Sequence, residues 1–177
     1  MRWVKYAIVA AILIPIFVIG SWAITDVVVH ETGDAEFCRT CHAMRPMVAA
    51  YREDVHGGAG EQGIQAACTD CHAPHNNPLN YMWAKVRFGS HSLWAQLTYD
   101  IDEIDWEAKR EERERLVFDS GCLQCHSDLE RASEGNPSSF IAHRAYFQGE
   151  TERQCVTCHA HVGHENLSAH LDRFFGE

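Results

Sequence analysis

All eight cysteines of the chain fall in one short pattern, C-x-x-C-H, which occurs four times. This spacing is the attachment signature of c-type haem, in which two thiols bond to the porphyrin and the adjacent histidine reaches the iron. Zinc sites or disulfides are alternatives for C-x-x-C units, but neither explains the histidine. The sequence therefore predicts four covalently bound c-type haems. The predicted attachment cysteines are Cys38, Cys41, Cys68, Cys71, Cys122, Cys125, Cys155 and Cys158, and the adjacent histidines are His42, His72, His126 and His159.

Two of the histidines outside these motifs repeat one spacing. His56 and His143 each stand 12 residues before a motif, the second and the fourth respectively. Low-spin electron-transfer haems usually take two protein ligands, so the repeated layout favours both as iron ligands over solvated loop residues. It also predicts two copies of a two-haem unit, at about 36–75 and 120–164.

Spacing separates the remaining histidines less clearly. His164 follows the last motif by five residues, which is close enough to hold it near the haems, and His161 competes with it as a ligand. His30 and His170 are expected to titrate in solvent. His75 and His91 are left unassigned.

Met44 lies two residues after the first motif and offers a thioether to iron. A methionine ligand raises the haem potential relative to a second imidazole, which suits a first haem that accepts electrons from a mild reductant. The alternative is a packing methionine, like Met47 beside it.

An uncharged segment at residues 6–25 precedes the haem region. About 20 apolar residues are what a helix needs to cross a bilayer, and this run is longer than the apolar core of a cleaved signal peptide. Two basic residues precede the segment and the first acid, Asp26, follows it, so the positive-inside rule places the rest of the chain outside the cytoplasm. We expect an anchor at 1–25 in a bacterial inner membrane, with a periplasmic haem domain at 26–177.

The composition of the chain limits which folds and which partners are expected. The chain has 15 Lys and Arg against 25 Asp and Glu, a formal net charge of −10, so it lacks the basic surface that nucleic-acid binding requires. The haem domain provides only about 38 residues for each haem, too few to enclose each porphyrin separately. The haems must then form much of the core, which predicts a mainly α fold with long loops and little or no sheet.

The segment 79–97 shows apolar residues at helical spacing and predicts an amphipathic helix. Its tyrosine and tryptophans favour the boundary between membrane and water. Lys85 within it could hydrogen-bond a quinone oxygen, or snorkel towards lipid headgroups. Residues 100–118 are charge-dense and predict a solvated helix, and residues 133–139 read as a loop.

The single anchor, the four motifs and the methionine after the first motif resemble the NapC/NirT/NrfH family of membrane quinol dehydrogenases, and most of all its branch that serves cytochrome c nitrite reductase. The resemblance implies that Met44 replaces His42 on the first iron. It implies that His56 is the distal ligand of haem 3 and His164 that of haem 2. Haem 4 would face the partner, which can supply its distal ligand, so the family assigns no role to His143.

The resemblance also implies a quinol site. Lys85 corresponds to the quinol-site lysine of the family, while the companion carboxylate falls at Ser92, a departure that leaves the proton acceptor open. His91 beside it, or Asp100 or Asp102 further on, could substitute.

The leading hypothesis is oxidation of menaquinol or ubiquinol from the membrane pool, with electrons passed to a periplasmic multihaem reductase. The implied partner is the catalytic subunit of cytochrome c nitrite reductase, with nitrate or other reductases as alternatives. A membrane-tethered carrier fed by a protein donor is a second hypothesis. A terminal reductase is disfavoured because the chain has no C-x-x-C-K motif.

Overall fold

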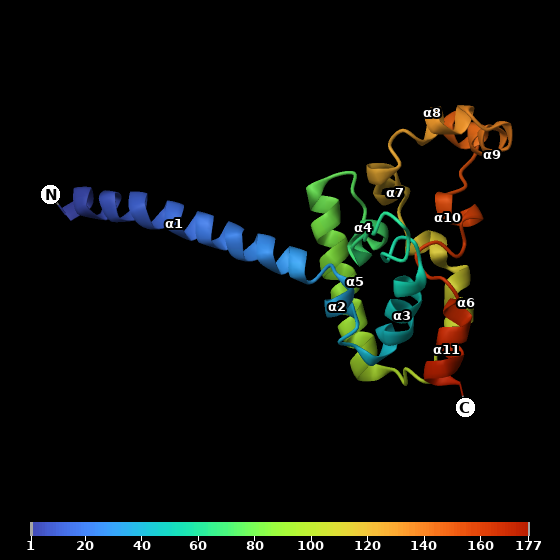
Figure 1. Cartoon of the computed structure of the whole chain (residues 1–177). Helices are drawn as coiled ribbons and strands as arrows, with labels where there is room; N and C mark the ends of the chain where they lie inside the picture. The colour runs from blue at the N-terminus through green and yellow to red at the C-terminus, as the bar shows by residue number, and fades with distance from the viewer. Residues whose placement is uncertain (1, 177) are drawn as a thin grey trace.

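The computed structural model describes residues 2–176, which form helices joined by loops (Figure 1). Among these residues the only β pairing is an isolated antiparallel bridge between Gly57 and Gln65. The predicted mainly α fold is confirmed. The helices are α1 (Arg2–Glu31), α2 (Ala35–Cys38), α3 (Arg45–Glu53), α4 (Cys68–His72), α5 (Pro78–Thr98), α6 (Trp106–Glu111), α7 (Asp119–Cys125), α8 (Leu129–Glu134), α9 (Pro137–Phe147), α10 (Cys155–Cys158) and α11 (Leu167–Phe175), with 3-10 turns η1 (His42–Met44) and η2 (Arg113–Arg115).

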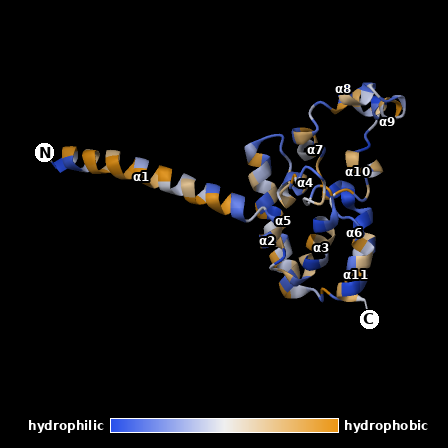
Figure 2. Ribbon diagram, viewed as in Figure 1, coloured by the Kyte–Doolittle hydropathy of each residue, from blue (hydrophilic) through white to orange (hydrophobic). Residues whose placement is uncertain are grey.

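Helix α1 projects from the rest of the molecule as a rod whose surface is apolar along most of its length (Figures 1 and 2). None of its residues is buried against other parts of the chain. Within residues 2–176 it is the one helix long and apolar enough to cross a membrane. The helix continues through Pro15 and ends at Glu31, so it extends beyond the uncharged segment 6–25.

Helix α5 lies on the side of the domain that α1 enters, and the two helices run in clearly different directions (Figure 1). Asn77 caps α5 by accepting a hydrogen bond from the backbone N–H of Asn80 at 2.8 Å, and Pro78 occupies the first turn. The helix predicted over 79–97 is confirmed. Its apolar residues recur at helical spacing and form an exposed stripe of Leu79, Trp83, Val86, Leu93, Trp94 and Leu97.

The side-chain core of the domain is small and lies where α3 packs against α11. Ala50, Leu167 and Leu171 are buried there, and Met47, Trp106 and Phe175 cover them. A core of this size agrees with the small number of residues available per haem.

The packing of α11 on α3 corrects the expectation that His170 titrates in solvent. The residue is 4% exposed, and its Nε2 lies 3.1 Å from a carboxylate oxygen of Glu53. The hydrogen bond from His170 lowers the pKa of the Glu53 carboxyl. His170 therefore ties the end of the chain to α3, a contact that sequence spacing does not reveal.

The single helix expected over 100–118 is also wrong. Helix α6 begins only at Trp106, where the Asp105 side chain accepts a hydrogen bond from the backbone N–H of Ala108 at 2.8 Å. Ile101 is buried in the preceding loop. Burial of this one apolar side chain and the Asp105 cap together favour a loop followed by a short helix.

The loop expected over 133–139 is mostly helical. Helix α8 ends at Glu134 and α9 begins at Pro137. Asn136 caps α9 by accepting hydrogen bonds from two backbone N–H groups, and the proline stands in the first turn. An Asn-Pro pair of this kind starts a helix as readily as it makes a turn.

Helices α4 and α7 approach each other closely because Gly121 has no side chain. A Cβ at this position would lie 1.8 Å from the carbonyl oxygen of Asp70, far inside van der Waals contact. Beside it the backbone N–H of Phe118 donates to the carbonyl of Cys71 at 3.0 Å. The second and third motifs therefore depend on this glycine for their contact.

We predict that Gly121→Ala destabilises the chain, because the new methyl group collides with backbone that has little room to move. Overpacking of this kind costs about 2–3 kcal/mol, which lowers the melting temperature by roughly 5 °C or more. The measurement is thermal unfolding of the full chain in detergent, followed by circular dichroism.

The matched control is Gly89→Ala on α5, where an added Cβ meets nothing within 4 Å. Alanine is the better helix former, so this variant should melt at the same or a higher temperature. Equal melting temperatures for the two variants would show that the contact at Gly121 does not matter.

Candidate functional site

Each C-x-x-C-H motif lies on or beside a short helix. The second motif fills α4, the third forms the end of α7, and the cysteines of the fourth begin and end α10, while the first motif starts at the last residue of α2. A single helical turn holds the two cysteines of a motif on one side of the backbone. In the second, third and fourth motifs the local structure therefore presents both thiols together, as attachment of one porphyrin requires, while Cys41 of the first motif stands in extended backbone just before η1.

The four motifs are neighbours in the order of the sequence. The Cys68 thiol lies beside that of Cys38 and lowers its pKa, which brings the first and second motifs together. The second motif contacts the third through α4 and α7. The third and fourth meet at Cys122 and Cys155, where the Cys155 thiol lowers the pKa of Cys122 to about 7. Both two-motif halves therefore bring their first cysteines together in the same way.

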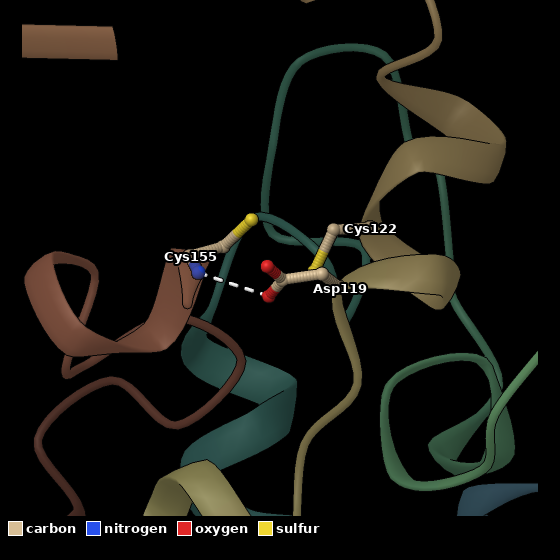
Figure 3. Close-up of side chains that lie close together, drawn as sticks. All are labelled: Asp119, Cys122 and Cys155. Carbon is tan, nitrogen blue, oxygen red and sulfur yellow. Dashed lines mark hydrogen bonds between the residues drawn. The ribbon is translucent and has the colours of Figure 1, made fainter. Parts of the chain in front are cut away.

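Asp119 joins the third motif to the fourth. Its carboxylate accepts a hydrogen bond from the backbone N–H of Cys155 at 2.9 Å (Figure 3). Ligand atoms of Asp119, Cys122 and Cys155 all lie within 4.8 Å of one another, a group that could hold a metal ion. Since both sulfurs belong to haem-attachment motifs, we interpret the cluster as a measure of how closely two haem sites are packed.

Three motif histidines each face one of the histidines singled out from spacing. A metal–imidazole bond is about 2 Å long, so two rings on opposite sides of one metal hold their centroids about 6 Å apart. The ring centroids are 6.1 Å apart for His72 and His164, 6.3 Å for His126 and His56, and 6.2 Å for His159 and His143. All three separations fit one iron between two rings.

Hydrogen bonds orient four of these rings for metal binding. Nδ1 of His56 lies 2.9 Å from a carboxylate oxygen of Asp54. The Nδ1 atoms of His72, His143 and His164 lie 2.8–3.1 Å from backbone carbonyl oxygens. An oxygen of this kind accepts a hydrogen, so the neutral ring carries its proton on Nδ1 and leaves the Nε2 lone pair free. Metal-ligating histidines are oriented in this way.

Two other histidines have the opposite arrangement. The Nε2 atom of His75 lies 3.1 Å from the carbonyl oxygen of Thr69, so its proton is on Nε2. His161 receives a hydrogen bond on Nδ1 from Arg110, at 3.0 Å, which again leaves the proton on Nε2. Neither ring presents a free Nε2, and this separates His161 from its competitor His164.

The rings of His72 and His164 are held in the neutral state. Burial lowers the pKa of His72, and burial together with the nearby His72 lowers the pKa of His164 to about 4. Both imidazoles are therefore unprotonated at neutral pH. A neutral imidazole is the form that binds a metal.

The first motif is arranged differently. Nε2 of His42, the atom that would reach iron, lies 3.5 Å from a carboxylate oxygen of Asp102. Met44 is partly buried and stands at the end of η1, in the same short turn as His42. The contact with Asp102 engages the Nε2 atom that would otherwise bind iron. This fits the implied replacement of His42 by Met44 as the iron ligand of the first motif.

The residues implied for quinol are spread along α5. Lys85 is half-buried, and its ammonium donates a hydrogen bond to the backbone carbonyl of Val29 near the end of α1. Burial lowers the pKa of Lys85. His91 and Ser92 lie further along the helix and are both exposed. The structure thus places Lys85 at the junction with α1 and leaves the other two on the surface.

Asp54 is a functional residue that spacing did not reveal. It is 5% exposed and binds His56 through one oxygen, while its other oxygen accepts the backbone N–H of Gly163 at 3.0 Å. Gly163 precedes His164, so one carboxylate organises two of the paired rings. The signal available in the sequence is an acid two residues before a candidate histidine.

The chain matches known cytochromes over most of its length. The profile of the NapC/NirT cytochrome c family, N-terminal region, matches residues 2–169. The tetraheme c-type cytochrome CymA of Shewanella oneidensis is 29% identical over 175 residues, 90% of this chain and 91% of CymA. The denitrification system component NirT of Stutzerimonas stutzeri is 32% identical over 156 residues, 81% of this chain and 74% of NirT.

Some relatives are longer. The cytochrome c-type protein TorY of Escherichia coli O157:H7 is 30% identical over 155 residues, 82% of this chain but only 41% of TorY, so the chain spans less than half of that relative. A chain of the cytochrome c nitrite reductase NrfHA complex, solved with the inhibitor HQNO, has the same fold, with a TM-score of 0.55, 22% identity and coverage of 87% of this chain and 90% of its own. With four attachment motifs, one apolar helix and a profile match over residues 2–169, this chain belongs to the NapC/NirT family of membrane-anchored tetrahaem c-type cytochromes.

Proposed function

We propose that the chain oxidises quinol at the membrane surface and delivers the electrons to a periplasmic multihaem reductase. The observation that carries the proposal is the continuous series of sites that begins beside the junction of α1 and α5. Lys85 reaches the end of the apolar helix, and the Cys38 and Cys68 thiols are adjacent beyond it. The third and fourth motifs follow in order.

The chain's own residues supply most of the iron ligands in this proposal. His72 and His164 bind one iron, His126 and His56 a second, and His159 and His143 a third. The three ring separations near 6 Å and the orientation of the Nδ1 atoms support these assignments. Met44 serves the first motif in place of His42. When bound, four covalently attached haems supply one-electron redox chemistry along the domain.

Membrane geometry supports quinol as the donor. With α1 across the bilayer and the domain on the periplasmic side, α5 lies against the surface that α1 leaves (Figure 1). Its exposed stripe of leucine, valine and tryptophan side chains suits the membrane boundary. A quinol at the membrane surface would then lie close to Lys85, whose ammonium bonds to the end of α1. The inner membrane of a bacterium is the location that this arrangement requires.

The proposed acceptor is the catalytic subunit of cytochrome c nitrite reductase. The shared fold with a chain of the NrfHA complex favours this choice. Nitrate and other periplasmic reductases are the alternatives, which the varied relatives favour. His143 faces His159 within this chain, so the partner does not need to donate a ligand to the fourth motif. We therefore infer a complex that dissociates between encounters.

A membrane-tethered carrier fed by a protein donor is the second candidate function. The missing family carboxylate, at the position of Ser92, favours it. The two functions differ in whether quinol alone reduces the protein.

We predict that His164→Ala converts one of the four haems from low spin to high spin, because it opens a coordination position. His161→Ala, three residues away, should leave all four spin states unchanged, since its Nδ1 is occupied by Arg110. Electron paramagnetic resonance of the oxidised full-length protein in detergent measures both. A new high-spin signal in His161→Ala alone would reverse the ligand assignment.

We also predict that Lys85→Ala slows haem reduction by a menaquinol analogue about tenfold or more, because a quinol oxygen loses its hydrogen-bond donor. Stopped-flow absorbance under anaerobic conditions measures the rate. Lys109→Ala is the control, since Lys109 is exposed and pairs with Glu112. If dithionite reduces the wild-type protein but the quinol analogue does not, the tethered carrier is the correct function.

A further inference from the structure

A pocket of about 500 Å³ lies where the end of α1 meets the start of α5. It is open to solvent and combines polar with apolar walls. Asp26, Val29 and His30 line it from α1. The facing wall comes from the loop before α5 and from its first turn, with His75, Asn76, Asn77, Pro78 and Tyr81. The pocket therefore stands at the membrane end of the domain.

Lys85 adjoins this pocket rather than the exposed end of α5. Its ammonium bonds to the carbonyl of Val29, which is one wall. It also lies 5.8 Å from the ring centroid of Tyr81, which is the other wall. The Lys85 ammonium therefore lies next to one residue from each wall of the pocket, a cationic hydrogen-bond donor adjoining the space that a headgroup would fill.

His75 is arranged as a proton acceptor in the same pocket. Its Nε2 carries the proton that the Thr69 carbonyl accepts, at 3.1 Å, so its Nδ1 lone pair is available. The Tyr81 ring packs against it with centroids 5.2 Å apart and fixes its orientation. The titratable groups that line the pocket with it are Asp26 and His30 from α1 and Tyr81 from α5, and Lys85 lies next to Tyr81. On its other side the Ser120 hydroxyl of α7 accepts the backbone N–H of His75 at 2.9 Å.

The opposite direction along α5 offers no comparable site. Ser92 stands two helical turns beyond Lys85 and is exposed, as is His91. Asp102 is exposed and already faces His42 at 3.5 Å. None of these three residues lines the pocket beside Lys85.

We infer that the quinol headgroup binds in the pocket between α1 and α5, and that His75 accepts a proton from it in place of the missing family carboxylate. The inference rests on the proposed quinol oxidation and adds its site and its proton acceptor. Both O–H bonds of the quinol break and two C=O bonds form. Two electrons leave, one at a time, to the attached haems. One proton goes to Nδ1 of His75 and the other to Asp26 or His30, from which both pass to water.

Filling the pocket tests the binding site without any turnover. Val29→Trp places an indole in the pocket, while Val27→Trp places one on the exposed surface of the same helix, where Val27 is 59% exposed. We expect Val29→Trp to weaken binding of menadione to the oxidised holoprotein at least tenfold, and Val27→Trp to leave it within twofold. Equilibrium dialysis measures both, and equal binding by the two variants would overturn the site.

Removing the base tests the proton acceptor. His75→Gln keeps an amide donor for the Thr69 carbonyl but loses the ring nitrogen. Loss of a general base typically costs 10²–10⁴-fold, so we expect reduction by menadiol to slow about tenfold or more at pH 7. The difference in reduction rate between His75→Gln and the wild type should shrink as pH rises, because water then takes the proton more readily. Menadione binding and dithionite reduction should stay within twofold.

His91→Gln is the matched control on the exposed part of α5. If His91→Gln is reduced slowly while His75→Gln is reduced at the normal rate, the acceptor is His91, beside the family position at Ser92, and the inference is overturned. If menadiol reduces the wild-type protein and yet neither pocket variant differs from its control, the pocket is wrong while quinol oxidation stands. If menadiol fails to reduce even the wild-type protein, the proposed function itself fails.

Discussion

Four attachment motifs must be held in contact by a domain whose own apolar core is very small. Only three buried side chains form the cluster between α3 and α11, so close packing of motif against motif takes over the role of a core. Backbone approaches such as that of Gly121 to Asp70 become essential for this reason. Short helices and long loops follow, because no regular layer is available for them to pack on.

Asp54 shows how the domain compensates for its small core. A buried carboxylate is costly unless its oxygens are bonded. Here one oxygen accepts a hydrogen bond from the His56 ring, and the other accepts one from the backbone N–H of Gly163, next to His164. Two rings from distant parts of the chain are thereby oriented by one side chain. The His170 contact with Glu53 holds α11 to α3 just beside this point.

The other organising feature is the junction of α1 with α5. Lys85 bonds to the last part of α1, so the apolar helix and the domain have a defined connection. The same contact sets one end of α5 beside the pocket of mixed polar and apolar walls and leaves the apolar stripe outside. The pocket therefore lies where the apolar helix meets the domain, as the proposed entry of electrons from a lipid-soluble donor requires.

The sequence by itself determined the local features of this protein. Haem attachment, the apolar helix and the α5 helix were predictable because each depends on residues a few positions apart. Spacing also selected His56, His143 and His164, although it could not rank His161 below His164 or place His170.

Residue spacing did not pair the rings. The family resemblance implied partners for His56 and His164, and the tertiary structure places those rings opposite His126 and His72. It also decided that His143 faces His159, which neither spacing nor the resemblance indicated. The tautomers of His72 and His164 were likewise inaccessible, since the oxygen beside each Nδ1 belongs to a distant segment. The contact of Asp102 with His42 and the pocket beside Lys85 could not be predicted from the sequence either. They form where loops bring distant segments of the chain together, and residue periodicity does not predict the path of a loop.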